Sequence, residues 1–216
     1  MGKASRLKKE RASQVPKPVK VKTRAPLELL QEAIVTVGDS YGERPDCANA
    51  AALLKEAARH LGYELKERAV SMIIRDTSSG DIVVMGPKAK ASLSPEAQEH
   101  LETRYAGDEN NGHVILTCED PKMLIDANLR QLGSHGIAAP SLAINIRSTE
   151  PVSGEWEAEI GNLQLLYMLD EENRRLVGNF GALERSKAKD GKYLADMLKA
   201  GYNADDMRRL LTRLPG

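Results

Sequence analysis

Aromatic residues, cysteines and long apolar runs are all scarce in this sequence of 216 residues. Aromatics make up 4% of the chain, with one Trp and one Phe, so aliphatic side chains have to build the core. Two cysteines are too few for a fold stabilised by several disulfide bonds. No apolar run approaches the roughly 18 residues that span a bilayer. We therefore expect no membrane span. With no secretory signal in view, the composition favours a reducing, cytoplasmic environment.

Charge is balanced overall but is placed unevenly along the chain. Residues 1–24 contain nine Lys or Arg and a single acid, a net charge of +8, so the rest of the chain carries −8. A stretch this charged cannot bury enough surface to fold alone, and we expect a disordered basic tail. Such a tail suits an anionic partner, either nucleic acid or an acidic protein surface. Its central cations are Lys8, Lys9, Arg11, Lys17, Lys20 and Lys22.

Beyond the tail, apolar periodicity predicts two helices, then strands, then helices again. Helical stripes cover residues 25–38 and 47–62, and each ends at a glycine. The strand patterns lie at residues 63–76, 110–120, 122–130, 141–146 and 154–170. This order predicts an α+β fold in which a central helix carrying Cys47 packs on an antiparallel β-sheet, followed by C-terminal helices. We divide the chain into a tail (1–24), a folded domain (25–187) and a C-terminal helical extension (188–216).

Three residues have settings that suit joint chemistry: Cys47, His113 and Asp126. Cys47 is the first helical residue after Asp46, where the positive end of the helix dipole stabilises a thiolate. His113 opens one strand and Asp126 ends the next, and a turn at residues 120 and 121 pairs positions whose numbers sum to about 241. In that register Asp126 is a diagonal neighbour of His113, roughly 5–8 Å away, so the carboxylate can reach the imidazole. The alternative for Cys47 is a plain buried cysteine, and for Cys118, in mid-strand, we expect a packing role.

This order of residues resembles the papain-like cysteine enzyme superfamily, within it the transglutaminase-like and arylamine-acetyltransferase-like branch. The segment "GHVILTCEDPKMLIDANLRQ" is similar to a Gly-His, Asp and Gln stretch of many bacterial transglutaminase-like proteins. The resemblance covers about residues 40–132. It implies that Cys47 is the nucleophile, His113 the base and Asp126 the group that orients the base.

The resemblance also indicates where a developing oxyanion would be bound. Papain-like peptidases carry an oxyanion-hole Gln at the position of Tyr41, whose hydroxyl would donate beside the Cys47 backbone N–H. Further candidates for contacts with the oxyanion or the substrate are Asn49 and Gln131.

The sequence thus predicts a cysteine-dependent enzyme acting on an amide or acyl substrate, proteins included. Peptide hydrolysis, side-chain deamidation and acyl transfer all stay open as reactions. The alternative is a non-catalytic binding protein that uses its basic tail on an anionic partner. Neither a metal-ligand spacing nor a nucleotide-binding glycine loop is present, so we expect no metal and no cofactor.

Overall fold

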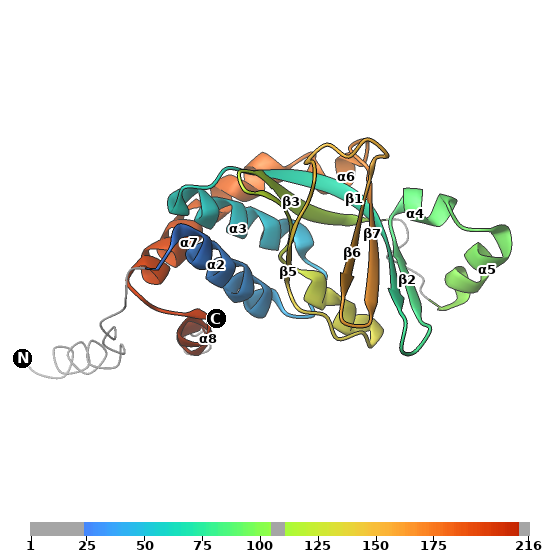
Figure 1. Ribbon diagram of the computed structural model, residues 1–216, viewed down its shortest axis with the longest axis horizontal. Helices are drawn as coiled ribbons and strands as arrows, with labels where there is room; N and C mark the ends of the chain where they lie inside the picture. The colour runs from blue at the N-terminus through green and yellow to red at the C-terminus, as the bar shows by residue number, and fades with distance from the viewer. Residues whose placement is uncertain (1–23, 105–110, 212–216) are drawn as a thin grey trace, which may run out of the picture.

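The computed structural model describes residues 24–104 and 111–211. The predicted basic tail therefore lies outside the described residues, except for Arg24. The helices of the described chain are α2 (Pro26–Tyr41), α3 (Cys47–Leu61), α4 (Pro87–Ala91), α5 (Pro95–Arg104), the 3₁₀ helix η2 (Leu129–His135), α6 (Arg174–Val177), α7 (Phe180–Lys199) and α8 (Ala204–Leu211) (Figure 1). The strands are β1 (Leu65–Asp76), β2 (Ile82–Met85), β3 (His113–Glu119), β4 (Lys122–Asp126), β5 (Leu142–Asn145), β6 (Glu155–Ile160) and β7 (Leu163–Leu169).

All seven strands belong to one antiparallel sheet with the order β5-β4-β3-β1-β7-β6. Strand β1 pairs with two strands along the same edge, since it is long enough for both. Its residues 65–70 pair with β3, and its residues 72–75 pair with β2. The predicted α+β class, antiparallel sheet and C-terminal helices are confirmed. In the described part of the chain, no helix has the length and apolar character needed to cross a membrane.

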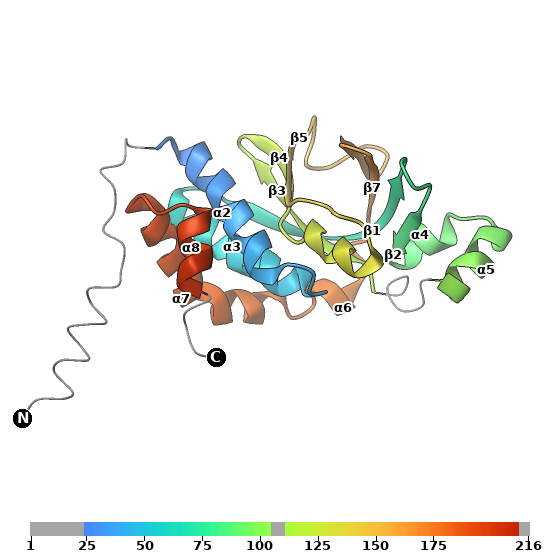
Figure 2. The same ribbon diagram turned by 90° about the horizontal axis from the view of Figure 1, so that it is seen from below.

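One face of the sheet packs against helices α2, α3 and α7, which gather with α8 at one end of the molecule, while α4 and α5 lie at the other (Figure 2). Small side chains on α3 let α7 come close. A Cβ atom added at Gly191 of α7 would lie 2.5 Å from the Glu56 Cβ atom and 2.8 Å from the Ala57 nitrogen. The boundary predicted between residues 187 and 188 falls inside α7, so both sides of that boundary belong to one helix packed on α3.

The opposite face of the sheet covers a second apolar cluster. Its side chains come from all seven strands, and η2 adds Leu129 and Leu132 from the side. Tyr167 of β7 is fully buried in this cluster. The polar residues described below as the candidate site lie where β3, β4, β7 and η2 meet.

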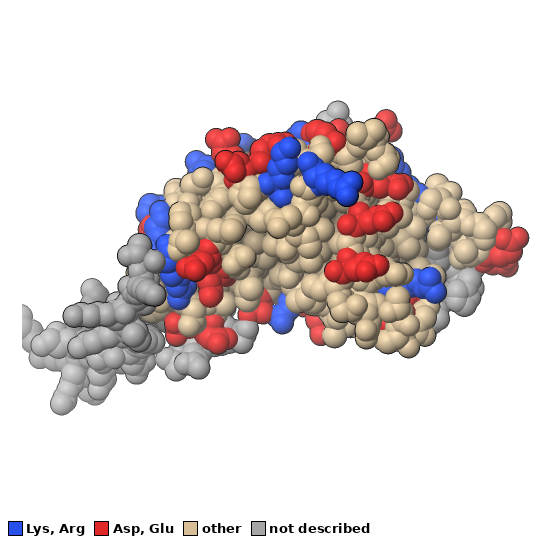
Figure 3. Space-filling view, in the orientation of Figure 1, with Lys and Arg blue, Asp and Glu red and all other residues tan. Residues whose placement is uncertain are grey.

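The exposed side chains of β6 are acidic. Glu157 and Glu159 alternate with the buried Trp156 and Ala158, and the strand begins with Glu155. Figure 3 shows acidic side chains in a row where Figure 1 places this strand. Strand β6 ends the sheet, and charged side chains on such a strand discourage pairing with another chain.

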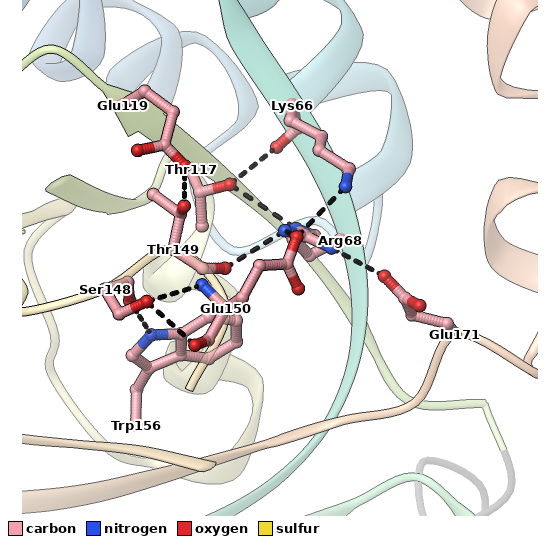
Figure 4. Close-up of polar contacts among 9 residues, drawn as sticks. All are labelled: Lys66, Arg68, Thr117, Glu119, Ser148, Thr149, Glu150, Trp156 and Glu171. Carbon is pink, nitrogen blue, oxygen red and sulfur yellow. Dashed lines mark hydrogen bonds and ion pairs between the residues drawn. The ribbon is translucent and has the colours of Figure 1, made fainter. Parts of the chain in front are cut away.

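A buried arginine ties the segment before β6 to the middle of the sheet (Figure 4). The Arg68 side chain is 1% exposed, and its guanidinium donates to the Thr149 carbonyl at 3.0 Å and pairs with Glu171 at 2.6 Å. It also pairs with Glu150, a carboxylate that Lys66 reaches as well. Because one planar group serves several acceptors from different segments, Arg68 fixes the β5–β6 connection against β1.

Replacing Arg68 with methionine is expected to lower the free energy of unfolding by about 2–3 kcal/mol. The loss stays below that of a fully buried ion pair, because the partner carboxylates are largely exposed and return to water. Urea denaturation measures the change. Lys66→Met is the matched control, since Lys66 contacts the same Glu150 from an exposed position and should change stability by less than about 0.5 kcal/mol. Equal losses in both variants would contradict the prediction.

Candidate active site

Cys47 is the first residue of α3 and is partly exposed. Asp46 occupies the N-cap position, but its side chain does not cap the helix, because its Oδ1 atom accepts a hydrogen bond from Asn49 Nδ2 at 2.8 Å. The side chain of Asp46 therefore leaves the first-turn N–H groups uncapped beside the sulfur. Such groups carry partial positive charge and favour an anion near them.

The hairpin β3–β4 brings His113 and Asp126 to the same end of two neighbouring strands. Leu116 pairs with Ile125 and Thr117 with Leu124, which is the register predicted from the turn. The turn itself consists of Asp120 and Pro121, joined by a cis peptide bond. His113 begins β3, Asp126 ends β4, and both side chains are fully buried.

The structure brings Cys47, His113 and Asp126 together. The His113 Nε2 atom lies 2.9 Å from Asp126 Oδ1, and Cys47 lies near enough to the same ring to influence its pKa. Burial, the largest single influence, lowers the pKa of His113. The carboxylate of Asp126 and then Cys47 act in the opposite direction and raise that pKa from 6.5 to about 10. The imidazole is thus held between two groups that favour its protonated form.

Asp126 is held by two groups that the sequence did not point to. The Tyr167 hydroxyl donates to Asp126 Oδ2 at 3.2 Å, and the Asn128 backbone N–H donates to Oδ1 at 3.1 Å. The Asn128 side-chain amide also donates to the Arg44 carbonyl at 2.9 Å, which ties the end of β4 to the loop before Cys47. These contacts fix the carboxylate and connect it to the segment that carries the thiol.

Replacing Tyr167 with phenylalanine tests the contact with Asp126. Burial, together with the nearby carboxylate, raises the pKa of the Tyr167 phenol well above its ordinary value, so the hydroxyl keeps its proton and donates. Its loss leaves a buried carboxylate oxygen without this donor and should lower the free energy of unfolding by about 1–3 kcal/mol. Tyr193→Phe, at an exposed position on α7, should leave stability unchanged in the same denaturation measurement. A Tyr167→Phe protein as stable as the parent would contradict the assignment.

The other predicted site residues have different settings. Gln131 joins the cluster, since its Nε2 atom lies 2.7 Å from His113 Nδ1 and its side chain is buried. Asn49 lies on the first turn of α3 and bonds to Asp46. Tyr41 ends α2, and burial raises the pKa of its hydroxyl, while the nearby Lys187 acts in the opposite direction. Among the hydrogen bonds found in the described residues, none joins Tyr41 to Cys47 or His113.

Cys118 has the surroundings of a packing residue. It is buried on β3, and its thiol donates to the Asp120 carbonyl at 3.3 Å. Burial raises the pKa of this thiol, which opposes formation of a thiolate. Across residues 24–104 and 111–211, no group of three His, Cys, Asp or Glu side chains is arranged to hold a metal ion.

Comparison with known proteins assigns no family to the chain. It matches no protein-family model, no curated protein and no solved structure. The arrangement of Cys47, His113 and Asp126 is therefore interpreted from its own geometry.

Proposed function

We propose that this protein is a cysteine-dependent enzyme of the papain-like, transglutaminase-like type, acting on an amide or acyl substrate. In this proposal a central helix, α3, carries the nucleophile Cys47. The observations that support it are the buried imidazole of His113, whose Nε2 atom lies 2.9 Å from the Asp126 carboxylate, and the influence of the nearby Cys47 on the pKa of that ring. A nucleophile, a base and a group that orients the base are the parts required for attack on a carbonyl.

The first half of the proposed reaction forms a thioester. In the reactive pair the proton of the Cys47 thiol resides on His113, as the raised pKa of that ring favours, and the thiolate attacks the carbonyl carbon of the substrate. The negative charge that develops on the carbonyl oxygen is stabilised by the N–H groups at the start of α3, including that of Cys47. His113 then returns the proton to the leaving nitrogen or oxygen as the carbonyl re-forms. Asp126 holds the ring in one orientation and stabilises its positive charge.

The second half depends on which nucleophile attacks the thioester. Water gives peptide hydrolysis or deamidation, whereas an amine gives acyl transfer. His113 and Asp126 are fully buried and Cys47 is partly exposed, so a substrate would approach at the sulfur. This accessibility suits a carbonyl group that projects from a larger molecule, such as a protein side chain.

An activated ester tests the proposal without knowledge of the substrate. The full chain is mixed with p-nitrophenyl acetate, and intact-mass and peptide mass spectrometry locate the acetyl group. We expect a transient acetyl adduct on Cys47 that water or an added amine removes. A protein that acted only through its basic tail would show no preferred acetylation of Cys47, and that result would refute the enzyme proposal.

A further inference from the structure

The amide of Gln131 contacts the His113 ring nitrogen that Asp126 leaves free. His113 has two nitrogens, and Nε2 is engaged by Asp126 at 2.9 Å. In the proposed reaction Nδ1 is therefore the nitrogen that would exchange a proton with Cys47. The Gln131 amide nitrogen lies 2.7 Å from this Nδ1 atom, and η2 keeps the side chain buried at 3% exposure. Gln131 can thus influence where the proton between sulfur and ring resides.

Proton transfer changes what Nδ1 requires of Gln131. A neutral ring bonded to Asp126 through Nε2–H has a lone pair on Nδ1 and accepts a hydrogen bond from the amide N–H. After the ring takes the proton of Cys47, Nδ1 carries a proton as well, and two N–H groups cannot face each other at 2.7 Å. An amide has nearly the same shape with nitrogen and oxygen exchanged, so a half turn of the Gln131 amide would place Oε1 against Nδ1–H.

The surroundings of the amide favour such a turn. A separation of 2.7 Å suits a bond from a charged N–H donor to an oxygen acceptor. The amide nitrogen has one other contact among the described residues, with Met85 Sδ at 3.9 Å, and sulfur is a weak acceptor. Little is lost when the nitrogen turns away from it.

We propose that Gln131 is a positioning residue for His113, whose amide oxygen accepts the Nδ1 proton of the imidazolium and so favours proton transfer from Cys47. This inference rests on the proposed function of Cys47. In the step concerned, the S–H bond of Cys47 breaks and the Nδ1–H bond forms, which leaves a thiolate and an imidazolium and needs no other reactant. The role differs from the substrate contact that the sequence suggested for Gln131.

The other groups around the ring act in the same direction. Asp126 from β4 and Cys47 from α3 are the groups whose charges raise the pKa of His113, and Tyr167 from β7 acts through Asp126. On β1, the residue paired with His113 is the apolar Val70. Gln131 adds an uncharged hydrogen-bond acceptor to the groups around the His113 ring. Asp126 therefore stays the one carboxylate in contact with this ring among the described residues.

The test is the pH dependence of Cys47 alkylation by iodoacetamide, in which the thiolate displaces iodide. The full chain is used, and peptide mass spectrometry locates the label. Gln131→Met removes the acceptor at similar side-chain length and should move the midpoint of reactivity up by about one pH unit or more, roughly a tenfold lower rate near pH 6. Gln131→Glu keeps an acceptor and should leave the midpoint at or below that of the parent. Gln164→Met, on an exposed part of β7, should change nothing.

The direction in which Gln131→Met moves the midpoint of Cys47 alkylation distinguishes an accepting Gln131 from a donating one. If Gln131 instead acts by donating to a neutral ring, Gln131→Met frees Nδ1 for the thiol and moves the midpoint down, which overturns the proposal. An unchanged midpoint overturns it too. Should Gln131→Met fail to fold, nitrogen-15 NMR of the parent protein replaces it. A proton on Nδ1 of His113 at pH 7 supports the proposal, and a lone pair there refutes it. None of these measurements needs a substrate, so a lack of acyl transfer would refute the proposed function without altering this result.

Discussion

Cys47→Ala is expected to abolish acetylation by the activated ester and any amide or acyl turnover, with a loss of at least about 10³-fold. The substitution removes the atom that attacks, and no neighbouring side chain replaces it. Folding should be little affected, because Cys47 is partly exposed at a helix start and the lost contacts amount to about 1 kcal/mol or less. Rates are measured by release of p-nitrophenol, and folding by circular dichroism.

The matched control is the second cysteine. Cys118→Ala removes a thiol that is buried on β3 and faces the helices, so it should lower stability by roughly 1 kcal/mol and leave the rate unchanged. A pattern in which Cys118→Ala stops the reaction while Cys47→Ala spares it would mean that the wrong cysteine has been assigned. The helix-start argument for Cys47 would then fail with it.

The meeting of His113 with Asp126 was predictable because it depends on local structure. A turn at Asp120 and Pro121 fixes the register of two adjacent strands, and the register fixes which side chains are neighbours. One short segment therefore contains enough information to bring the imidazole and the carboxylate together. The position of Cys47 at the start of a helix is equally local, since it follows from where the apolar stripe begins.

The partners of Asp126 and Tyr41 were not predictable, because they come from distant segments. Tyr167 reaches Asp126 only because β7 pairs with β1 on the side away from β3, and nothing within 163–169 specifies that partner. Lys187 reaches Tyr41 because α7 packs beside α2 and α3. The hydroxyl of Tyr41, which its position in the sequence suggested for the oxyanion, therefore lies near a lysine whose position could not be predicted from sequence spacing.

The boundary predicted between residues 187 and 188 was also affected by a contact between distant segments, in this case a contact made by a glycine. Gly191 lies just beyond that boundary, and a glycine inside a helical pattern weakens the prediction of a continuous helix. In the structure it lies inside α7, at a position where any side chain would collide with the backbone of α3. The glycine serves close helix packing, and its partner at residues 56 and 57 is remote in sequence.

The second large effect concerns the buried pair of His113 and Asp126. The pKa of His113 is raised from 6.5 to about 10, so the folded protein holds this proton more tightly than the unfolded chain. The resulting stabilisation is complete below pH 6.5 and is lost as the pH rises towards 10. We expect the free energy of unfolding to fall by a few kcal/mol over this interval. Urea denaturation of the parent protein measures this fall, and the Cys47→Ala protein, which lacks one of the groups that raise this pKa, should show a smaller fall of the same sign.

Adding Asp126→Asn to the Cys47→Ala protein should reverse the slope. Without the carboxylate, burial is the main remaining influence, and it lowers the pKa of His113 below 6.5. The free energy of unfolding of the double variant should therefore decrease as the pH falls below 6.5. At pH 7 its His113 ring is neutral, so a charged ring contributes nothing to its stability. At pH 7 we expect it to be about 3–5 kcal/mol less stable than Cys47→Ala alone, because one member of a buried pair has been removed. If the two proteins instead show parallel curves from pH 5 to 10, Asp126 is not what holds the His113 proton, and its orienting role in the proposed mechanism fails as well.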